Sequence, residues 1–285
     1  MDFAKMHGLG NDYVVVDGFR EKLDEQALPG IARRLCDRHF GIGSDGLILV
    51  LPSRVANVRM RMFNPDGSEA EMCGNGIRCF GKFVHDREIS RENPLSVETL
   101  AGVKTLKLSI EGGLVVSSRV DMGQPRLRRG EIPMSDPPRG TAGRTEQVIG
   151  EPIKVGAKRF EATCVSMGNP HCVIFVDDVD HFPVESIGPI IEHHRLFPQR
   201  TNVEFVQVLN AKEIRVRVWE RGAGITPACG TGACASVVAS SLNDRTDRKV
   251  TVHLPGGDLH VEWLGDGRVM MTGPAEEVFT GTIGL

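Results

Sequence analysis

The chain has 285 residues, a length that predicts two domains or one large domain with a sizeable buried core. Its 34 Lys and Arg residues against 37 Asp and Glu residues leave a formal net charge of -3, so no basic surplus indicates binding to nucleic acid or to a membrane surface. Seven cysteines, an odd number in a long chain, favour a reducing compartment over a disulfide framework, and the lack of a signal-peptide pattern or a long apolar run predicts a cytoplasmic protein.

Hydrophobic spacing predicts mostly strands, with a few helices packed against them. In chain order, apolar residues recur at helical spacing over 77–84, and they alternate on both sides of a Gly-Gly turn over 106–116. A helix bounded by prolines is expected over 187–194, followed by an Ala- and Ser-rich helix over 233–242 that we expect to be enclosed on several sides. Alternation around a Pro-Gly-Gly turn over 250–263 predicts a second antiparallel hairpin. These elements indicate a mixed α/β (α+β) fold.

An internal repeat divides the sequence into two similar halves. The segment 10–17 resembles 168–177, and Cys-Gly-Asn-Gly at 73–76 matches Cys-Gly-Thr-Gly at 229–232. Coincidence is the alternative for each short match alone. Because the two matches occur in the same order and at nearly the same offset, we interpret them as a duplication.

The domain boundary is expected in the Gly-, Pro- and Arg-rich stretch 123–143, whose composition suits a linker or a long loop. This places residues 1–122 and 275–285 in an N-terminal domain that carries Cys73. Residues 123–274 form a C-terminal domain that carries Cys229. Each predicted domain therefore contains one copy of the cysteine motif.

Both cysteine motifs stand at the start of a helical pattern. The N-terminus of a helix presents unpaired N–H groups and a positive dipole, which bind anions and lower the pKa of a thiol. The glycines after Cys73 and Cys229 leave room for a substrate to reach the backbone. A single buried cysteine usually packs as a small apolar residue, but two at matching positions indicate chemistry.

The remaining cysteines and the histidines give weaker signals. His171 follows Asn169, which aligns with Asn11, so we expect it to support the site; the alternative is a polar contact at a strand end. Neither the cysteine spacing nor any glycine motif predicts a zinc site or a nucleotide cofactor, so we expect no metal and no cofactor. The cysteines expected to pack in the core are Cys36, Cys79, Cys164, Cys172 and Cys234.

Paired thiols suggest a reaction class. A thiolate base and a thiol acid on opposite sides of one carbon atom would invert a stereocentre. Asn64 stands nine residues before Cys73, and Glu220 stands nine before Cys229, followed by Arg221. A Glu and an Arg suit the ammonium and carboxylate groups of an amino acid, although a surface ion pair is the alternative.

With these residues identified, the sequence resembles the diaminopimelate epimerase family over nearly its whole length. The second cysteine motif and its preceding Glu-Arg pair are highly specific in combination with the first. The segments that carry the resemblance are KMHGLGND at 5–12, FNPDGS at 63–68, CGNGIRCF at 73–80, GNPH at 168–171, TNVEF at 201–205, WERG at 219–222 and ACGTGAC at 228–234.

The resemblance implies cofactor-independent epimerisation of LL- to meso-diaminopimelate, in lysine and peptidoglycan precursor biosynthesis. It implies two pseudo-symmetric domains, each of mostly antiparallel strands around a central helix, with the site in the cleft between them. Cys73 and Cys229 are then the paired acid and base, supported by His171. The residues implied to bind the small-molecule substrate are Asn11, Asn64, Asn169, Asn202, Glu220 and Arg221, with backbone amides around Gly74, Asn75, Gly230 and Thr231.

Three positions depart from the family pattern. Gly46 replaces a Gln found in some members, Ile225 stands where a Glu is usual, and Pro227 adds rigidity just before Cys229. We expect these changes to affect substrate affinity rather than the reaction.

Two other functions compete with this interpretation. A proline racemase or hydroxyproline epimerase of the same fold group also uses two cysteines, but a cyclic substrate would not need the Glu-Arg pair and the asparagines. A binding protein that has lost the thiol chemistry would not need both cysteines. The sequence leaves open which thiol starts as the thiolate, and it leaves open the oligomeric state, with a homodimer among the alternatives.

Overall fold

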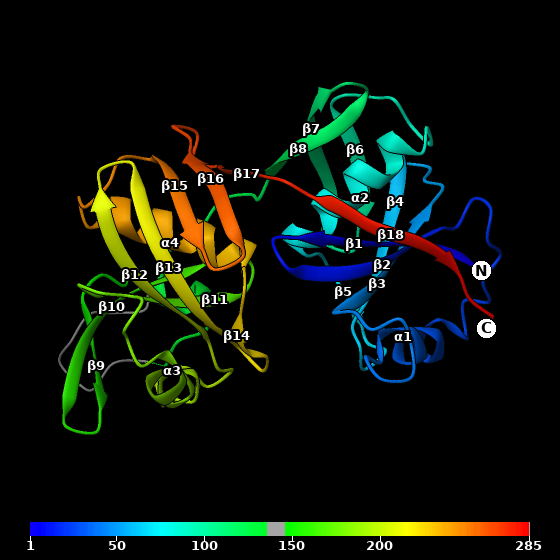
Figure 1. Cartoon of the computed structure of the whole chain (residues 1–285). Coiled ribbons are helices and arrows are strands. Elements are labelled where there is room, and N and C mark those ends of the chain that lie inside the picture. Colours follow the sequence, from blue (N-terminus) through cyan, green and yellow to red (C-terminus); the bar gives the residue numbers. More distant parts are fainter. Residues whose placement is uncertain (136–145, 285) are drawn as a thin grey trace. The chain divides into compact units, whose positions relative to one another are not determined.

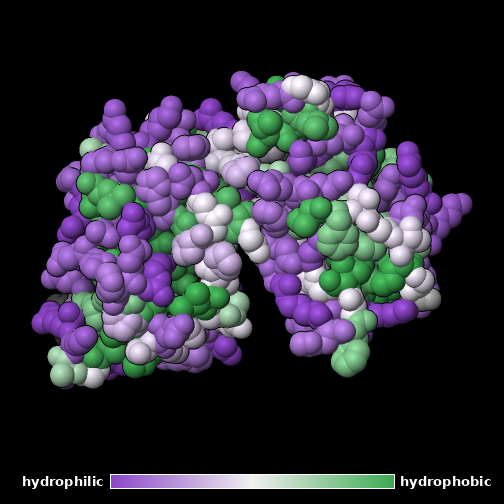
Figure 2. Space-filling view, in the orientation of Figure 1, coloured by the Kyte–Doolittle hydropathy of each residue, from purple (hydrophilic) through white to green (hydrophobic). Residues whose placement is uncertain are grey.

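The computed structural model describes residues 1–135 and 146–284, and its contacts divide the chain into two compact units. Unit 1 consists of Met1–Asp121 and Thr272–Leu285, and unit 2 consists of Met122–Met271. The chain therefore leaves unit 1 once and returns to it for its last strand. Among the described residues, no helix is long and apolar enough to cross a membrane. Hydrophilic side chains cover most of the visible surface, with separate apolar patches between them (Figure 2).

Unit 1 surrounds one central helix with strands (Figure 1). Its helices are α1 (Leu28–Cys36) and the central α2 (Gly74–Asp86), and its strands are β1 (Asp2–Gly8), β2 (Asn11–Asp17), β3 (Gly46–Leu51), β4 (Val58–Phe63), β5 (Glu69–Ala70), β6 (Leu95–Thr99), β7 (Gly102–Glu111), β8 (Leu114–Asp121) and β18 (Glu276–Thr282). Helix α2 contacts β1, β2, β3 and β8, and it fully buries Ile77, Phe80 and Val84. This apolar face is the reason that the segment folds as a core helix.

The two ends of the chain meet in unit 1. β1 pairs antiparallel with β18 on one side and with β2 on the other. The N-terminal amine also donates a hydrogen bond to the carbonyl of Ile283 at 2.9 Å. The last strand therefore completes the edge of the sheet that the first strand begins.

Unit 2 has the same plan around helix α4. Its helices are α3 (Val184–Glu192) and α4 (Gly230–Leu242), with the short 3-10 turn Arg129–Glu131, and its strands are β9 (Glu151–Val155), β10 (Lys158–Ser166), β11 (Pro170–Phe175), β12 (Asn202–Asn210), β13 (Glu213–Glu220), β14 (Gly224–Thr226), β15 (Lys249–Leu254), β16 (Gly257–Trp263) and β17 (Val269–Gly273), the last of which runs across the boundary into unit 1. Helix α4 contacts β10, β11, β12 and β16, and ten of its thirteen residues are buried. Small Ala, Ser and Gly side chains allow this enclosure.

The predicted repeat is visible in the strand order. In unit 1, β2 pairs in parallel with β3, and helix α1 connects the two strands. β3 pairs antiparallel with β4, and β4 pairs with the short β5 that precedes α2. In unit 2, β11 and β12 form the same parallel pair across α3, β12 pairs antiparallel with β13, and β13 pairs with the short β14 that precedes α4. The prediction of two pseudo-symmetric halves is confirmed.

Most predicted elements occur where the spacing placed them, as α2, α3, α4 and the hairpins β7–β8 and β15–β16. Helix α1 was not predicted, because only Leu28, Ala32, Leu35 and Cys36 form its buried face within nine residues. The stretch 123–143 lies in unit 2, where Ile132 and Met134 are buried. Its part from residue 136 onward lies outside the described residues.

Candidate active site

A tight turn between β1 and β2 positions Asn11 in unit 1. Leu9 and Gly10 have φ angles of 59° and 86°, and Gly8 pairs with Asn11 across the turn. Two successive residues with positive φ are typical of the two-residue hairpin turn whose twist matches antiparallel strands. Asn11 is thereby fixed at the first position of β2.

Cys73 and Cys229 occupy equivalent places at the starts of the two central helices. Each is the N-cap residue of a thirteen-residue helix, with extended φ and ψ of -132° and 129° for Cys73 and -120° and 111° for Cys229. The Cys229 side chain accepts a hydrogen bond from the first turn of its helix, whereas the Cys73 side chain makes no such cap hydrogen bond. Both cysteines stand at a helix N-terminus, a position where unpaired N–H groups favour negative charge.

Two side chains contact the thiol of Cys73, and a third is hydrogen bonded to one of them. The Tyr13 hydroxyl oxygen lies 3.0 Å from the Cys73 Sγ, and the same hydroxyl donates a hydrogen bond to the Asn11 Oδ1. The Asn75 Nδ2 donates to the same Asn11 Oδ1 at 3.1 Å. The distance from the Cys73 Sγ to the Asn11 Oδ1 is 3.7 Å. We call these four residues the Cys73 cluster.

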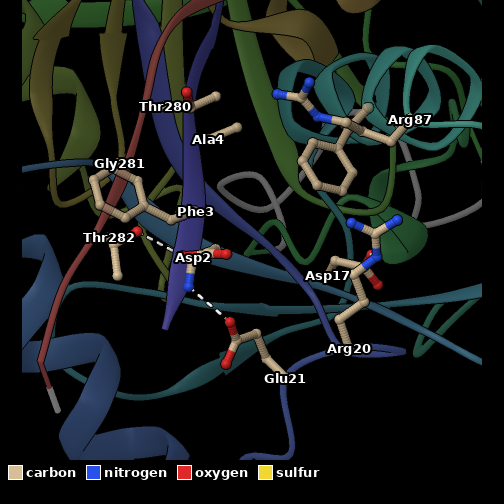
Figure 3. A pocket seen from close by; sticks show the side chains of 11 residues that line it. Asp2, Phe3, Ala4, Asp17, Arg20, Glu21, Arg87, Thr280, Gly281 and Thr282 are labelled. Atoms are coloured by element: carbon tan, nitrogen blue, oxygen red, sulfur yellow. Dashed lines mark hydrogen bonds and ion pairs between the residues drawn. The ribbon is translucent and has the colours of Figure 1, made fainter.

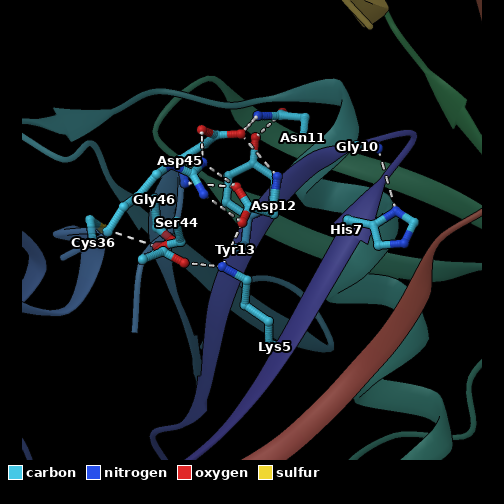
Figure 4. Close-up of polar contacts among 12 residues, drawn as sticks. Lys5, His7, Gly10, Asn11, Asp12, Tyr13, Cys36, Ser44, Asp45 and Gly46 are labelled. Atoms are coloured by element: carbon cyan, nitrogen blue, oxygen red, sulfur yellow. Dashed lines mark hydrogen bonds and ion pairs between the residues drawn. The ribbon is translucent and has the colours of Figure 1, made fainter. Parts of the chain in front are cut away.

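A network of charged residues binds Asn11, one member of this cluster (Figure 4). The Asn11 Nδ2 donates to the Asp45 carboxylate at 2.7 Å, and Arg38 binds both Asp45 and Asp12 at 2.8 Å. Lys5 also pairs with Asp12, at 2.5 Å. Although burial alone would raise it, the hydrogen bonds from Arg38 and Lys5 lower the pKa of Asp12 to about 2. Asp12 therefore remains ionised throughout the physiological pH range.

The thiol of Cys229 has polar neighbours of its own. The Gly232 backbone N–H donates to the Cys229 Sγ at 3.4 Å, and the Thr231 hydroxyl lies 3.5 Å from the sulfur. Asn169 donates from its Nδ2 to that hydroxyl at 3.3 Å. We call Cys229, Thr231, Asn169, His171 and Glu204 the Cys229 cluster. The contacts of His171 and Glu204 are described next.

His171 and Glu204 form a buried dyad that contacts Asn169. The His171 Nδ1 lies 2.7 Å from the Glu204 Oε1, both side chains are completely buried, and the His171 Nε2 lies 3.0 Å from the Asn169 Oδ1. Each ring nitrogen thus lies at hydrogen-bond distance from one oxygen. The dyad fixes the orientation of Asn169.

The expected lowering of the thiol pKa is not found at Cys229. Burial raises its pKa well above the ordinary value, and the carboxylates of Glu220 and Glu204 raise it further. The hydrogen bonds from Thr231 and the Gly232 N–H act in the opposite direction but offset only part of this. Desolvation therefore outweighs the helix N-terminus, and Cys229 holds its proton at neutral pH.

Asn202 joins two loops beside this cluster. Its Nδ2 donates to the Pro170 carbonyl at 2.8 Å, and its Oδ1 accepts the Arg221 backbone N–H at 2.9 Å. The Arg221 guanidinium donates to the Gln199 carbonyl at 3.3 Å. Glu220 accepts a hydrogen bond from the Thr226 hydroxyl. The Arg221 guanidinium and the Glu220 carboxylate are thus held by a backbone and a hydroxyl contact.

The model of the diaminopimelate epimerase family matches residues 3–128 and 163–278. The diaminopimelate epimerase of Moorella thermoacetica is 59% identical over 286 residues, covering 100% of both chains, and that of Methanococcus maripaludis is 52% identical over 286 residues with the same coverage. The chain belongs to the diaminopimelate epimerase family. This membership confirms the resemblance and the predicted enzyme class, an amino-acid epimerase among the isomerases.

Solved structures of lower identity share the fold. A phenazine biosynthesis protein of the PhzF family from Bacillus anthracis is 17% identical with a TM-score of 0.72, covering 100% of this chain and 99% of that one. A hydroxyproline epimerase from Agrobacterium vitis is 14% identical with a TM-score of 0.70, covering 99% and 91%. The predicted fold, with strands around a central helix in each half, is thereby confirmed.

Within each unit, most of the family's predicted site residues come together. Asn11, Cys73, Gly74 and Asn75 meet at the start of α2 in unit 1. Asn64 differs, because it lies after β4 and its side chain donates to the Ser68 hydroxyl at 2.9 Å. In unit 2 the residues that meet around the start of α4 are Asn169, His171, Glu220, Cys229, Gly230 and Thr231.

Two residues of these clusters were missed. Tyr13 stands among valines in a strand pattern, and a tyrosine there is typical of core packing. Glu204 stands in the apolar stretch of β12, where a charged residue in a buried strand was the one available signal.

Gly46, one of the departures, has a local explanation. It pairs with Tyr13 across β2 and β3, and a Cβ at this position would lie 2.9 Å from the Phe63 carbonyl oxygen and 3.3 Å from the Tyr13 ring. Glycine is thus the residue that leaves room for the tyrosine ring. Ile225 is 41% exposed on β14, and the Pro227 carbonyl accepts a hydrogen bond from the Gly256 N–H at 2.9 Å.

A separate pocket of about 390 Å³ lies at the beginning of β1 in unit 1 (Figure 3). It contains none of the predicted site residues, because Asn11 follows the other end of that strand. Charged side chains of both signs face it, including Asp2, Glu21 and Arg87. The Glu21 carboxylate accepts the Asp2 backbone N–H at 2.7 Å, a contact that belongs to the local fold.

Proposed function

We propose that the protein interconverts LL- and meso-diaminopimelate with Cys73 and Cys229 as paired acid and base. The observation that carries the proposal is the equivalence of the two thiols. Each caps a central helix of the same length and lies among amide and hydroxyl side chains, in a chain of this family. One thiol removes the proton of the α-carbon, and the other returns a proton to the opposite face.

The helix N-termini supply the electrostatic part of the reaction. Negative charge that develops on the α-carbon spreads to its carboxylate, and backbone N–H groups can stabilise it there. We assign this role to the amides around Gly74, Asn75, Gly230 and Thr231. The residues that we propose to bind the rest of the substrate are Asn11, Asn64, Asn169, Asn202, Glu220 and Arg221, with His171 in support through Asn169.

The two thiols start from different protonation states in this proposal. Burial and two carboxylates keep Cys229 in its thiol form, so it acts first as the proton donor. Cys73 then acts first as the base. The product, meso-diaminopimelate, would enter lysine and peptidoglycan precursor synthesis, in line with the family.

Deuterium exchange tests the proposal. LL-diaminopimelate is incubated in deuterated water with the wild type, Cys73→Ala or Cys229→Ala, and meso product and α-deuterium are followed by NMR. We expect each variant to lose at least about a hundredfold in epimerisation, because acid or base catalysis by one positioned group contributes that much. Cys36→Ala, a buried cysteine of α1, is the matched control and should retain turnover.

Substrate choice tests the second half. L-lysine and L-proline lack the distal amino-carboxylate, which would leave buried polar groups unpaired at a cost of about 1–3 kcal/mol each. Both should be very poor substrates. Near-native turnover by either alanine variant contradicts the acid and base assignment, and comparable rates with L-proline contradict the substrate assignment.

A further inference from the structure

The Tyr13 hydroxyl stands between two groups of the Cys73 cluster. Its oxygen lies 3.0 Å from the Cys73 Sγ and also contacts the Asn11 Oδ1. A phenol carries one hydrogen, so it can donate to only one of these acceptors at a time. The second contact must then have the tyrosine oxygen as acceptor, or it is lost.

The surroundings hold the ring in this place. Tyr13 is 1% exposed and pairs with Met6 of β1 and Gly46 of β3. Because a Cβ on Gly46 would lie 3.3 Å from the ring, the ring lies directly against the glycine backbone. The hydroxyl thus has little freedom except rotation of its hydrogen. Burial, and then the neighbouring Cys73, raise the pKa of Tyr13 well above its ordinary value, which keeps the hydroxyl protonated.

We propose that Tyr13 is a catalytic residue whose hydroxyl hydrogen alternates between Asn11 and Cys73 as the thiol loses and regains its proton. This inference rests on the proposed function, in which Cys73 exchanges a proton with the substrate. When Cys73 is a thiol, its S–H donates to the tyrosine oxygen and the hydroxyl donates to the Asn11 Oδ1. When Cys73 is a thiolate, the hydroxyl hydrogen turns toward the sulfur.

No proton leaves the tyrosine in this exchange. The proton moves between the substrate carbon and the Cys73 sulfur, and the hydroxyl only rotates. Asn11 remains hydrogen bonded in both states, because Asn75 donates to the same Oδ1 at 3.1 Å and Asp45 accepts from its Nδ2 at 2.7 Å. The thiolate gains a charge-assisted hydrogen bond, which is stronger than a neutral one.

The other titratable groups around Tyr13 do not explain a rotation of its hydroxyl hydrogen. Cys79 of α2 is fully buried, and burial raises its pKa to about 12. Asp45, in the loop before β3, is bound by Arg38 at 2.8 Å. Arg38 also holds Asp12, whose pKa of about 2 keeps it ionised. In this proposal the group beside Tyr13 that changes charge is Cys73, whose Sγ lies 3.0 Å from the hydroxyl oxygen.

The tyrosine count makes a direct test available, because Tyr13 is the one tyrosine of the 285 residues. Protein carrying ¹³C at the tyrosine Cζ gives a single reporter signal, which is followed by NMR from pH 6 to 10. We expect the signal to shift with the same midpoint as the alkylation of Cys73 by iodoacetamide, and to stay constant in Cys73→Ala. A constant signal in the wild type would overturn the proposal without any tyrosine variant having to fold.

Tyr13→Phe removes only the hydroxyl oxygen. Peptide mapping of iodoacetamide-treated protein gives the titration midpoint of both thiols in one sample. We expect the Cys73 midpoint to rise by about one pH unit or more and kcat to fall about ten- to hundredfold, in line with the loss of a hydrogen bond to a charged group. The Cys229 midpoint, in the other unit, should be unchanged and is the internal control.

The results separate this inference from the proposed function. An unchanged Cys73 midpoint and kcat in Tyr13→Phe would contradict the role of the hydroxyl while leaving the paired thiols in place. Near-native turnover by Cys73→Ala would instead contradict the proposed function. In that case, a wild-type Tyr13 signal that shifts with the alkylation midpoint of Cys73 would show the contact between the two residues and contradict the catalytic role of Tyr13.

Discussion

Glu204 is, after Glu220, the second carboxylate whose charge raises the pKa of the Cys229 thiol. Its Oε1 is paired with His171, whereas its Oε2 has no hydrogen-bond partner among the described residues. The carboxylate is completely buried and is one of the two that raise the pKa of Cys229. A negative charge in a site of low polarity acts strongly on a neighbouring thiolate.

Glu204→Gln removes this charge and keeps the shape of the side chain. Because the thiolate is then repelled less, the titration midpoint of Cys229 should move to lower pH, which thiol-specific alkylation followed by peptide mapping measures. Turnover should fall as well, because the contact that holds His171, and through it the orientation of Asn169, is altered. Glu185→Gln, in the first turn of α3, is the matched control and should change neither quantity. A midpoint that stays in place or moves upward would contradict the electrostatic role.

At the scale of an element, the first turn of α4 is packed without spare room. A Cβ added to Gly232 would lie 2.8 Å from the Glu204 Oε1 and 3.2 Å from the Cys229 Sγ. In α1, by contrast, a Cβ on Gly30 would meet no atom within 4 Å. Two helical glycines in one chain therefore differ in what a methyl group would meet.

Gly232→Ala should lower the free energy of unfolding by about 1–3 kcal/mol, because overpacking forces the dyad or the thiol to move. It should also reduce turnover. Gly30→Ala should instead stabilise the protein by about 0.4–1 kcal/mol, since alanine lowers the entropy of the unfolded chain. Urea unfolding of both variants measures the difference, and equal effects would show that the start of α4 tolerates a side chain.

The same helices show how far sequence reasoning reaches. Local spacing predicts α2 and α4, and the matched Cys-Gly-x-Gly motifs predict their N-caps, because these signals lie within a few residues. The pKa of Cys229 could not be predicted in the same way. Its direction depends first on burial, then on Glu220, and then on Glu204, which is 25 residues away in sequence and lies on a different strand. The contact between Tyr13 and Cys73 likewise joins β2 to α2, and spacing alone cannot show it.

For the whole molecule, the two units differ in how the chain builds them. Unit 2 is one continuous segment, whereas unit 1 needs both ends of the chain. Beyond the β1–β18 ladder, the Arg78 Nε donates to the Pro274 carbonyl at 3.0 Å, which ties the last segment to helix α2. We therefore expect the two units to depend differently on the C-terminal segment.

Deletion of residues 276–285 should destabilise unit 1 and leave unit 2 nearly unchanged. Intrinsic probes separate the two, because Trp219 and Trp263 lie in unit 2 and Tyr13 lies in unit 1. In thermal unfolding, tryptophan fluorescence should keep its midpoint, while the ¹³C signal of Tyr13 should lose its native position at lower temperature. The fragment 122–271 should unfold cooperatively by itself. Equal loss at both probes would mean that the two units unfold as one.

The pairing of the first strand with the last sets an order for biosynthesis. A ribosome makes β1 before β18, so the nascent chain exposes one edge of β1 until β18 has emerged. Unit 2 already has its whole sequence by then, and it can close first although it starts later. An open strand edge is a site for pairing with other chains. The open edge of β1 is therefore exposed to misassembly until Glu276–Thr282 emerge.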